Sequence, residues 1–122
     1  MSYKYAVIGY GFIGRRHVDT LKAFNESDCV AVCDIDERRL KEVKEKYPDM
    51  KVYKNAEELF AKEKLDGVII SANNKAHKEL TIMAAKNGCN IICEKPAAMT
   101  VKEFDEMMEV VKEEGVSFTV HQ

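Results

Sequence analysis

Three glycines near the amino terminus have the spacing of a phosphate-binding loop. Gly9, Gly11 and Gly14 directly follow an apolar run and open a stretch of helical period. In this context the first glycine permits a tight turn, the second lets a pyrophosphate approach the backbone, and the third lets the helix pack closely on the strand. The amide groups of Phe12 and Ile13 would meet the phosphate charge at the helix amino terminus. The pattern predicts a dinucleotide site.

An acidic residue stands where such a site would need one. Twenty positions after Gly14, the apolar run 29–33 ends at Asp34. A carboxylate there would accept hydrogen bonds from the adenosine ribose hydroxyls and repel a 2′-phosphate, which favours NAD over NADP as the cofactor. Arg38 and Arg39 stand one helical turn further on and could soften that repulsion. We count Arg39 among the cofactor-binding candidates, although a solvated or adenine-stacking role is the more ordinary one for both arginines.

A lysine lies between an acid and a proline in Glu94-Lys95-Pro96, at the end of another apolar run. A cationic ammonium beside a hydroxyl that is being oxidised would lower the pKa of that hydroxyl and stabilise the alkoxide. Without further information, a surface lysine on a loop is the more ordinary interpretation. His17 and His77 fall on helix faces that turn inward, where packed or hydrogen-bonded histidines are more usual than catalytic ones.

The composition is that of one ordinary globular domain. The 122 residues are 46% hydrophobic and 33% charged, which predicts a single domain over residues 1–122. A net charge of −2 provides no basic field for a phosphate backbone, so we expect no nucleic-acid partner. No segment approaches the roughly 18 apolar residues of a membrane span and the amino terminus lacks a cleavage site, so we expect no membrane contact and a cytoplasmic protein.

Four cysteines form two CxxxC pairs, Cys29 with Cys33 and Cys89 with Cys93. Each pair lies in an apolar, strand-like run, where residues i and i+4 point the same way about 13 Å apart, too far to share one metal ion. We therefore expect buried, reduced core cysteines and no metal site.

Apolar, β-branched runs alternate with stretches of helical period along the whole chain. The predicted strands are 5–8, 29–33, 51–53, 67–71, 89–93 and 116–120. The predicted buried helix positions are Ile13, His17, Leu21 and Phe24; Leu40, Val43 and Tyr47; Leu59 and Phe60; Ala76, Leu80, Met83 and Ala84; and Val101, Phe104, Met108 and Val111. Continuous apolar strands predict a parallel sheet covered on both faces, hence a doubly wound, three-layer α/β/α Rossmann fold.

Residues at the ends of these segments agree with the assignment. Thr100 with Glu103, and Asn55 with Glu58, match the capping-box pattern, and Asp36 can cap the second helix. Three further glycines are placed where a helix must turn into a strand: Gly67, Gly88 and Gly115.

The glycine loop, Asp34, the segment SANNKAH (71–77) and CEKP (93–96), in this order, resemble the amino-terminal domain of the Gfo/Idh/MocA oxidoreductases, the glucose-fructose oxidoreductase and inositol dehydrogenase group. The resemblance implies hydride transfer between a nicotinamide cofactor and a sugar, cyclitol or related polyol. It implies that Lys95 is the catalytic lysine, close to the nicotinamide ribose and the reacting hydroxyl, and that Glu94 binds or orients around that ribose.

The same resemblance places Asn74 and His77 on the family's Thr-Pro-Asn-x-x-His stretch, with Ala72 and Asn73 replacing threonine and proline. The resemblance therefore adds both residues to the cofactor-binding candidates. Asn74 could be a cofactor ligand, the cap of the fourth helix, or both.

In the family a second, sheet-rich domain supplies most of the substrate pocket and a histidine acid/base partner. This chain stops where the sixth strand ends, so we expect a piece of a longer enzyme that binds a dinucleotide and catalyses slowly or not at all. The substrate, and any homo-oligomer, would depend on that absent domain.

Three alternatives remain. Tyr47 and Lys51 have the Tyr-x-x-x-Lys spacing of short-chain dehydrogenases, but Pro48 lies between them and favours a chance match. Methyltransferases also pair a glycine loop with an acid, and would bind S-adenosylmethionine instead. A stand-alone dinucleotide-binding or redox-sensing module without catalysis is the third alternative.

Overall fold

The computed structural model describes residues 3–23, 26–72, 74–94 and 100–121. Strands and helices alternate in the order β1 (Tyr3–Ile8), α1 (Phe12–Ala23), β2 (Ser27–Cys33), α2 (Glu37–Lys46), β3 (Lys51–Tyr53), α3 (Ala56–Lys62), β4 (Gly67–Ile70), the 3-10 helix η1 (Asn74–Ala76), α4 (His77–Lys86), β5 (Asn90–Glu94), α5 (Val101–Glu114) and β6 (Phe118–His121). All six predicted strands are present.

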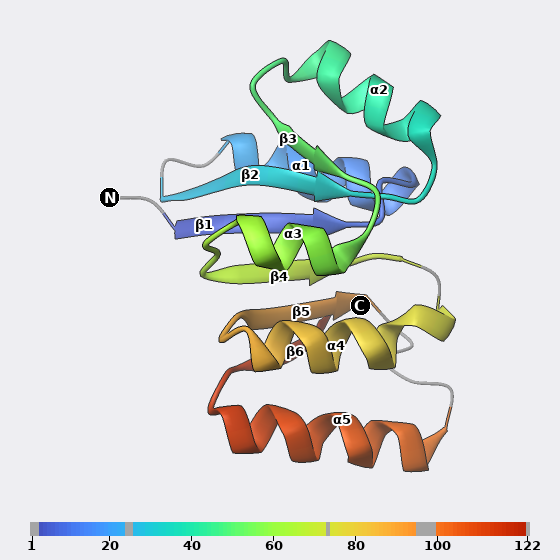
Figure 1. Ribbon diagram of the computed structural model, residues 1–122, viewed down its shortest axis with the longest axis vertical. Helices are drawn as coiled ribbons and strands as arrows, with labels where there is room; N and C mark the ends of the chain where they lie inside the picture. Colours follow the sequence, from blue (N-terminus) through green and yellow to red (C-terminus); the bar gives the residue numbers. More distant parts are fainter. Residues whose placement is uncertain (1–2, 24–25, 73, 95–99, 122) are drawn as a thin grey trace.

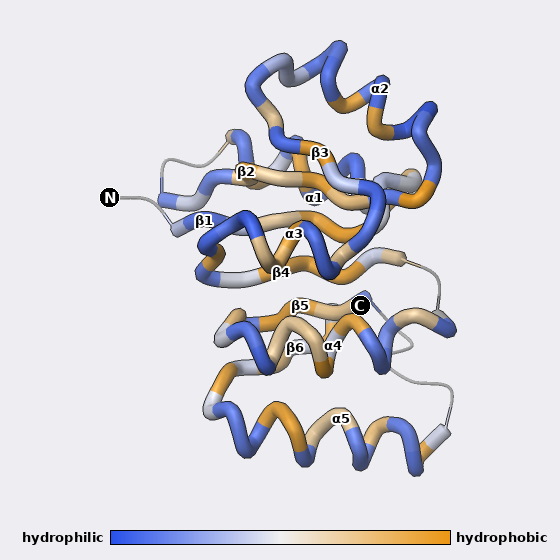
Figure 2. Tube along the Cα trace, viewed as in Figure 1, coloured by the Kyte–Doolittle hydropathy of each residue, from blue (hydrophilic) through white to orange (hydrophobic). Residues whose placement is uncertain are grey.

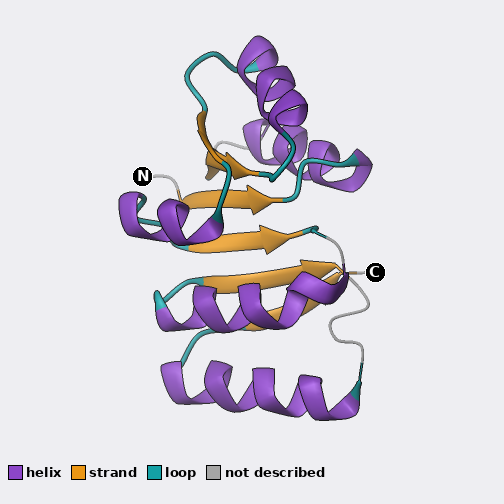
Figure 3. Cartoon of the chain, turned by 45° about the vertical axis from the view of Figure 1, so that its right-hand side comes forward, coloured by secondary structure: helices purple, strands orange, loops and turns teal. Residues whose placement is uncertain are grey.

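The six strands form one sheet in the order β3-β2-β1-β4-β5-β6, and every pair of neighbours is parallel. The arrowheads accordingly point to one edge in Figure 3. Strand order reverses between β1 and β4, so the loops after these two strands diverge and leave room for a ligand. The predicted doubly wound Rossmann fold is confirmed.

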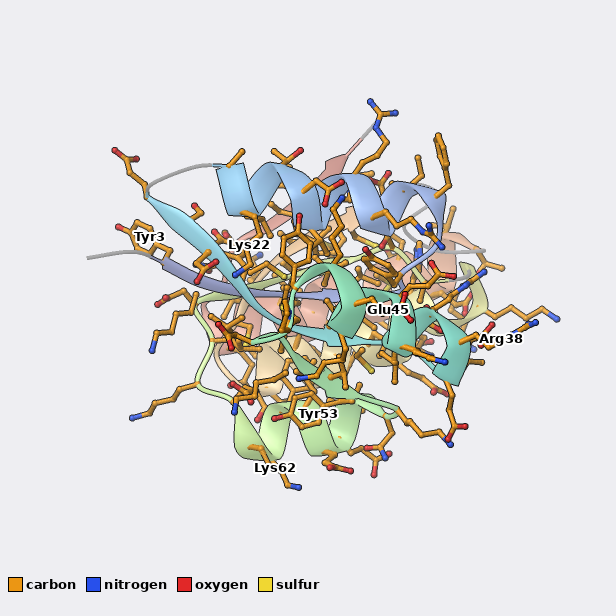
Figure 4. All side chains as sticks on the ribbon, turned by 90° about the horizontal axis from the view of Figure 1, so that it is seen from above. Tyr3, Lys22, Arg38, Glu45, Tyr53 and Lys62 are labelled. Atoms are coloured by element: carbon orange, nitrogen blue, oxygen red, sulfur yellow. The ribbon has the colours of Figure 1, made fainter. Side chains whose placement is uncertain are left out.

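Two apolar cores lie on opposite faces of the sheet. One contains residues of α1 and α2 against β1 and β2, including Val18 and Val43. The other contains residues of α3, α4 and α5, including Leu59 and Val111. In the view from above, α1 and α3 lie on opposite sides of the strands (Figure 4), and the apolar colouring follows the strands while α2 and α3 carry polar outer faces (Figure 2).

The predicted caps are confirmed. The side chains of Asp36, Asn55 and Thr100 accept hydrogen bonds from backbone amides in the first turns of α2, α3 and α5. Gly88 and Gly115 follow α4 and α5 with φ of 74° and 69°, the left-handed conformation that ends a helix before a strand.

Gly67 has a different role from the predicted one. It is the first residue of β4, and a Cβ atom there would lie 2.7 Å from the ring of Tyr5 and 3.0 Å from the carbonyl oxygen of Asn90. The glycine is needed because a neighbouring side chain packs directly on its backbone.

The predicted buried faces of α1 and α5 are wrong in part. The buried residues of α1 are Gly14, Val18 and Leu21, whereas Ile13 is exposed and Phe24 lies outside the described residues. The buried face of α1 differs from the predicted one because Gly14, not a larger side chain, packs against the glycine loop. In α5 the predicted burial of Val111 is confirmed, but the other buried residue is Met107; Val101 and Phe104 are exposed and Met108 is half-buried.

The other faces are confirmed in part. Leu40 and Val43 of α2 are buried, as are Leu59 and Phe60 of α3. In α4 the residues that face the sheet are His77, Thr81, Ala84 and Ala85, while Leu80 and Met83 are half-buried.

All four cysteines are free and buried, as predicted, but the geometry assumed for the first pair is wrong. Tyr5 pairs with Cys29 and Ala6 pairs with Ala31, so Val30 is an extra residue in β2. This bulge reverses the alternation of side chains, and Cys29 and Cys33 therefore enter opposite cores.

Candidate functional site

The carboxyl ends of four strands are aligned across the sheet. Ile8 of β1 pairs with Cys33 of β2 and with Ile70 of β4, which pairs with Cys93 of β5. The residues that follow these four are Gly9, Asp34, Ser71 and Glu94. At the usual spacing between strands, the backbones of Asp34 and Glu94 lie about 14 Å apart with the glycine loop between them. A ligand that contacted both would have to be extended.

The glycine loop has the geometry that the motif predicts. Gly9 has a φ of 99°, and a Cβ on Gly14 would lie 1.8 Å from the carbonyl oxygen of Gly9, so both positions exclude other residues. A Cβ on Gly11 would meet nothing closer than the Arg39 guanidinium at 3.8 Å. The loop is therefore tightly packed on the protein side and open at Gly11, where a ligand could approach.

Helix α1 begins at Phe12, directly after this opening. The first amide groups of a helix have no carbonyl partner within the helix, and they carry the positive end of its dipole. Phe12 and Ile13 are both exposed. The structure therefore places the start of α1, with the open backbone of Gly11, where an anionic group can be bound.

Asp34 connects the glycine loop to the turn after β2. Its Oδ2 accepts from the backbone N–H of Tyr10 at 2.7 Å, and its Oδ1 accepts from the backbone N–H of Asp36 at 2.8 Å. The side chain is 4% exposed. Each carboxylate oxygen has a second lone pair, so ligand hydroxyls could also be bound. Asp34 is thus both a candidate ligand and a structural link.

The two arginines after Asp34 differ in position. The Nη1 of Arg39 lies 3.4 Å from the Oδ2 of Asp34, and Arg39 lines the cleft. The side chain of Arg38 is 90% exposed, lies near Asp36 and projects from the periphery of the molecule in Figure 4. Only Arg39 is placed beside the candidate site.

A cleft of about 400 Å³ lies beside these residues. It extends from the glycine loop and Asp34 to the start of α3 and one side of α4. Its apolar wall contains Ile35, Ala72, Leu80 and Met83. The cleft therefore combines a charged end with an apolar wall that could hold a flat ring.

Sequence reasoning missed part of this cleft. Ser71 lines it and donates through Oγ to the carbonyl oxygen of Gly9 at 2.8 Å, which clamps the loop to the end of β4. Its position directly after an apolar strand was the available signal. Leu80 and Met83 were assigned to the core, but they pack on the core edge and also face the cleft.

Glu94 is the last residue of β5 and is half-buried. Its Oε1 lies 2.5 Å from the Nε2 of His17, which projects from α1. Because an ionised carboxylate only accepts hydrogen bonds, the histidine N–H is the donor. The predicted catalytic residue, Lys95, and Pro96 lie outside the described residues.

His77 is 1% exposed and does not line the cleft. Its Nε2 lies 2.9 Å from the carbonyl oxygen of Ala72, and its Nδ1 lies 3.3 Å from the Sγ of Cys93. This agrees with a packed, hydrogen-bonded histidine. Asn74 belongs to η1, and α4 begins after Ala76; the side chain of Asn74, which was predicted as a cap or a cofactor ligand, lies outside the described part of the chain.

The Tyr47–Lys51 pair has no catalytic geometry. Tyr47 donates to the Oδ1 of Asp19 at 2.6 Å, and burial together with that hydrogen bond raises the pKa of Tyr47 to about 12. Lys51 is the first residue of β3, at the opposite end of the strand from the cleft. The phenol is stabilised in its neutral form, which is unsuitable for a catalytic base.

Within the described residues, no cluster of three or more His, Cys, Asp or Glu side chains could hold a metal ion. In the same part of the chain, no helix has the length and apolar character that crossing a bilayer requires.

Comparison with known proteins agrees with this geometry. The profile of the family GFO_IDH_MocA, described as “Oxidoreductase family, NAD-binding Rossmann fold”, matches residues 3–122. Myo-inositol 2-dehydrogenase of Thermotoga maritima is 36% identical over 110 residues, or 90% of this chain and 33% of that protein. D-apiose dehydrogenase of Paraburkholderia graminis is 32% identical over 120 residues, or 98% of this chain and 32% of that protein.

Among solved structures, an oxidoreductase from Agrobacterium radiobacter in complex with NAD+, L-tartaric acid and magnesium superposes with a TM-score of 0.94 and 30% identity. The match covers 99% of this chain and 35% of that one. The chain thus spans about a third of the length of the relatives that it matches.

Proposed function

The chain belongs to the Gfo/Idh/MocA oxidoreductase family, and from that premise we propose that it binds NAD across the carboxyl ends of β2, β1, β4 and β5. The observation that carries the proposal is the contrast within the glycine loop. The backbone of Gly9 leaves no room for a side chain at Gly14, whereas Gly11 faces open space at the start of α1. That combination fits a pyrophosphate and has no packing function of its own.

The adenosine half would lie in the cleft beside Asp34. The carboxylate would accept from the ribose hydroxyls, and the wall that contains Ile35, Leu80 and Met83 would contact the adenine. A 2′-phosphate about 4 Å from Asp34 would be repelled by roughly 1 to 4 kcal/mol, which is a roughly fivefold to near thousandfold preference for NAD. Arg39, 3.4 Å from the carboxylate, reduces this preference toward its lower end.

The nicotinamide half would lie toward the end of β5, with Glu94 at its ribose. A bound nicotinamide supplies the hydride acceptor or donor. Lys95 follows Glu94 directly in the chain, and we propose it as the catalytic residue that holds or releases the proton of the substrate hydroxyl. The family resemblance, together with the position of Glu94 at the same edge as the glycine loop, supports this role.

The whole protein would act on a sugar, cyclitol or related polyol. Support comes from the relatives, which include an inositol dehydrogenase and a sugar dehydrogenase, and which are about three times as long as this chain. We propose that the additional length of such proteins supplies the substrate pocket. The 122 residues alone would then bind the cofactor and show little or no turnover.

A redox-sensing role is disfavoured by the cysteines. Burial raises the pKa of the thiols of Cys29, Cys33 and Cys93 to about 12 and that of Cys89 to about 11. Reactive sensor cysteines need an accessible thiolate, and these thiols are neither accessible nor acidic.

Titration of the chain with NADH, followed by nicotinamide fluorescence, tests the proposal. Gly11→Ala is the matched control, because the methyl group meets nothing closer than 3.8 Å in the protein but occupies the opening for the pyrophosphate. We expect saturable binding in the native chain and its loss in Gly11→Ala with unchanged stability. Equal binding by both proteins would contradict the proposed site.

A further inference from the structure

The last two residues of β5 are held from opposite faces of the sheet. Cys93 belongs to the core that contains α3, α4 and α5, and it meets His77 of α4. Glu94, the next residue, points to the other face and meets His17 of α1. Two histidines, 60 residues apart in the chain, therefore contact consecutive residues immediately before Lys95.

The hydrogen bonds of His77 have a defined direction. A carbonyl oxygen can only accept, so Nε2 of His77 carries a proton and donates to Ala72. Nδ1 of His77 lies 3.3 Å from the Sγ of Cys93, whose S–H can donate to it or to the carbonyl oxygen of Glu94 at 3.5 Å. Burial, with a smaller effect of the Glu94 charge, raises the pKa of Cys93 to about 12, so this thiol keeps its proton. His77 thus joins the end of β5 to Ala72, a residue of the cleft wall.

His17 makes the corresponding link on the other face. It lies on α1, the helix that begins at the glycine loop, and its ring N–H donates to Glu94 over 2.5 Å. The side chains of His17 and Glu94 are 15% and 18% exposed, so little water competes for this hydrogen bond. The end of β5 is therefore tied to the helix that would bind the pyrophosphate.

We propose that His17 and His77 are a pair of positioning residues, which hold the end of β5 between the glycine-loop helix and the cleft wall and so direct Glu94 toward the nicotinamide half of the dinucleotide. The inference rests on the proposed function. His77 was a cofactor-binding candidate from the sequence, but it is 1% exposed and does not line the cleft, so we propose that it acts through Cys93 and Ala72.

The test compares NADH with ADP, which has the adenosine and pyrophosphate but neither the nicotinamide nor its ribose. His17→Leu removes the donor to Glu94, and Cys93→Ala removes the thiol beside His77. In each variant we expect about tenfold weaker NADH binding, with ADP affinity changed by less than about twofold. Equal weakening for both ligands would mean a general structural role and would overturn the proposal, as would no change for either.

Conservative variants separate positioning from folding. His17→Gln keeps a side-chain N–H that can reach Glu94, and Cys93→Ser keeps a donor for His77. Both should bind NADH within about threefold of the native chain. Failure of these two variants to restore NADH binding, with ADP affinity intact, would contradict the hydrogen-bond roles assigned to the two histidines.

The tautomer of His77 provides a readout that needs no ligand. In ¹⁵N-labelled native chain, Nε2 of His77 should carry a proton, because it lies against the carbonyl oxygen of Ala72. An unprotonated Nε2 would overturn the link from Cys93 through His77 to Ala72. If the native chain bound neither NADH nor ADP, the proposed function would fail, whereas selective defects can only be judged in a chain that binds both.

Discussion

The two ends of the candidate site are held together by different kinds of contact. At the end beside Asp34, backbone groups dominate: the amides of Tyr10 and Asp36 donate to Asp34, and the carbonyl of Gly9 lies against Gly14. At the end of β5, the contacts join side chains from separate helices, His17 with Glu94 and His77 with Cys93. Backbone geometry restricts the residue type at each position, whereas side-chain contacts leave a weaker trace in the sequence.

The largest effect on the free energy of unfolding should follow from adding a side chain at Gly14, where the glycine loop packs on the protein. In Gly14→Ala the new methyl carbon would lie 1.8 Å from the carbonyl oxygen of Gly9. Loop and helix must separate, at a cost of about 3 kcal/mol or more in unfolding free energy. Chemical denaturation would measure this loss, and Gly11→Ala, which has open space, should unfold like the native chain. Similar stability of the two variants would remove the distinction between the closed and open glycines.

Replacement of Asp34 should cause the second-largest loss in unfolding free energy. Asp34→Ala leaves two amides near the buried carboxylate position without their acceptor, and we expect a loss of about 2 to 4 kcal/mol in unfolding free energy. Binding of NADH and NADPH should both weaken, because the glycine loop loses its link to β2.

Asp36→Ala is the control for Asp34→Ala. It removes only the cap of α2 and should cost about 1 kcal/mol. If Asp34→Ala bound NADPH more tightly than NADH and was as stable as the native chain, Asp34 would be a cofactor ligand without a structural role.

High pH should destabilise the fold through a buried thiol at each end of the site. Cys33 lies beside Asp34 and Cys93 beside Glu94, and burial raises the pKa of each thiol from 9.0 to about 12. The folded state thus holds these protons more tightly than the unfolded chain. The stability that they contribute is complete below pH 9.0 and is lost as the pH rises toward about 12.

Thiol titration with a disulfide reagent checks the burial at neutral pH. The native chain should react slowly at all four cysteines and the denatured chain rapidly. Rapid reaction of one native thiol would identify an opening at that end of the site.

The smallest effect is expected from a substitution that lies away from both ends of the candidate site. Thr100 accepts from the amide of Glu103 at the start of α5, and Thr100→Ala should cost about 1 kcal/mol in unfolding free energy. NADH affinity should not change. Thr100→Ser keeps the hydroxyl and serves as the control, and a large loss of affinity in the alanine variant alone would show that the start of α5 contributes to the site.

The fold was predictable because strand runs, caps and turn glycines each carry a local signal. Thr100 and Asn55 cap their helices, and Gly88 and Gly115 end theirs, for reasons contained in a few neighbouring residues. The bulge at Val30 was not predictable, since it depends on the register between β1 and β2. Gly67 was misread for a similar reason, because its neighbour Tyr5 is 62 residues away in the chain.

The candidate site, like the fold, was predictable where it depends on local backbone requirements. Gly9, Gly11, Gly14 and Asp34 follow from backbone requirements that any such loop must satisfy. Ser71 was missed because a serine after a strand is common and its partner, the carbonyl oxygen of Gly9, is known only from the fold. The histidines could be placed on inward faces, but the structure was needed to show that they meet Cys93 and Glu94.

The most direct measurement is the change in backbone amide resonances when NADH is added to ¹⁵N-labelled chain. We predict that the largest shifts occur at the aligned strand ends: Tyr10 to Ile13, Asp34 and Ile35, Ser71 and Ala72, and Glu94. Asp66 and Asn90, at the opposite edge of the sheet, should not move. Shifts confined to that opposite edge, or no shifts at saturating NADH, would contradict the assignment of a dinucleotide site to this chain.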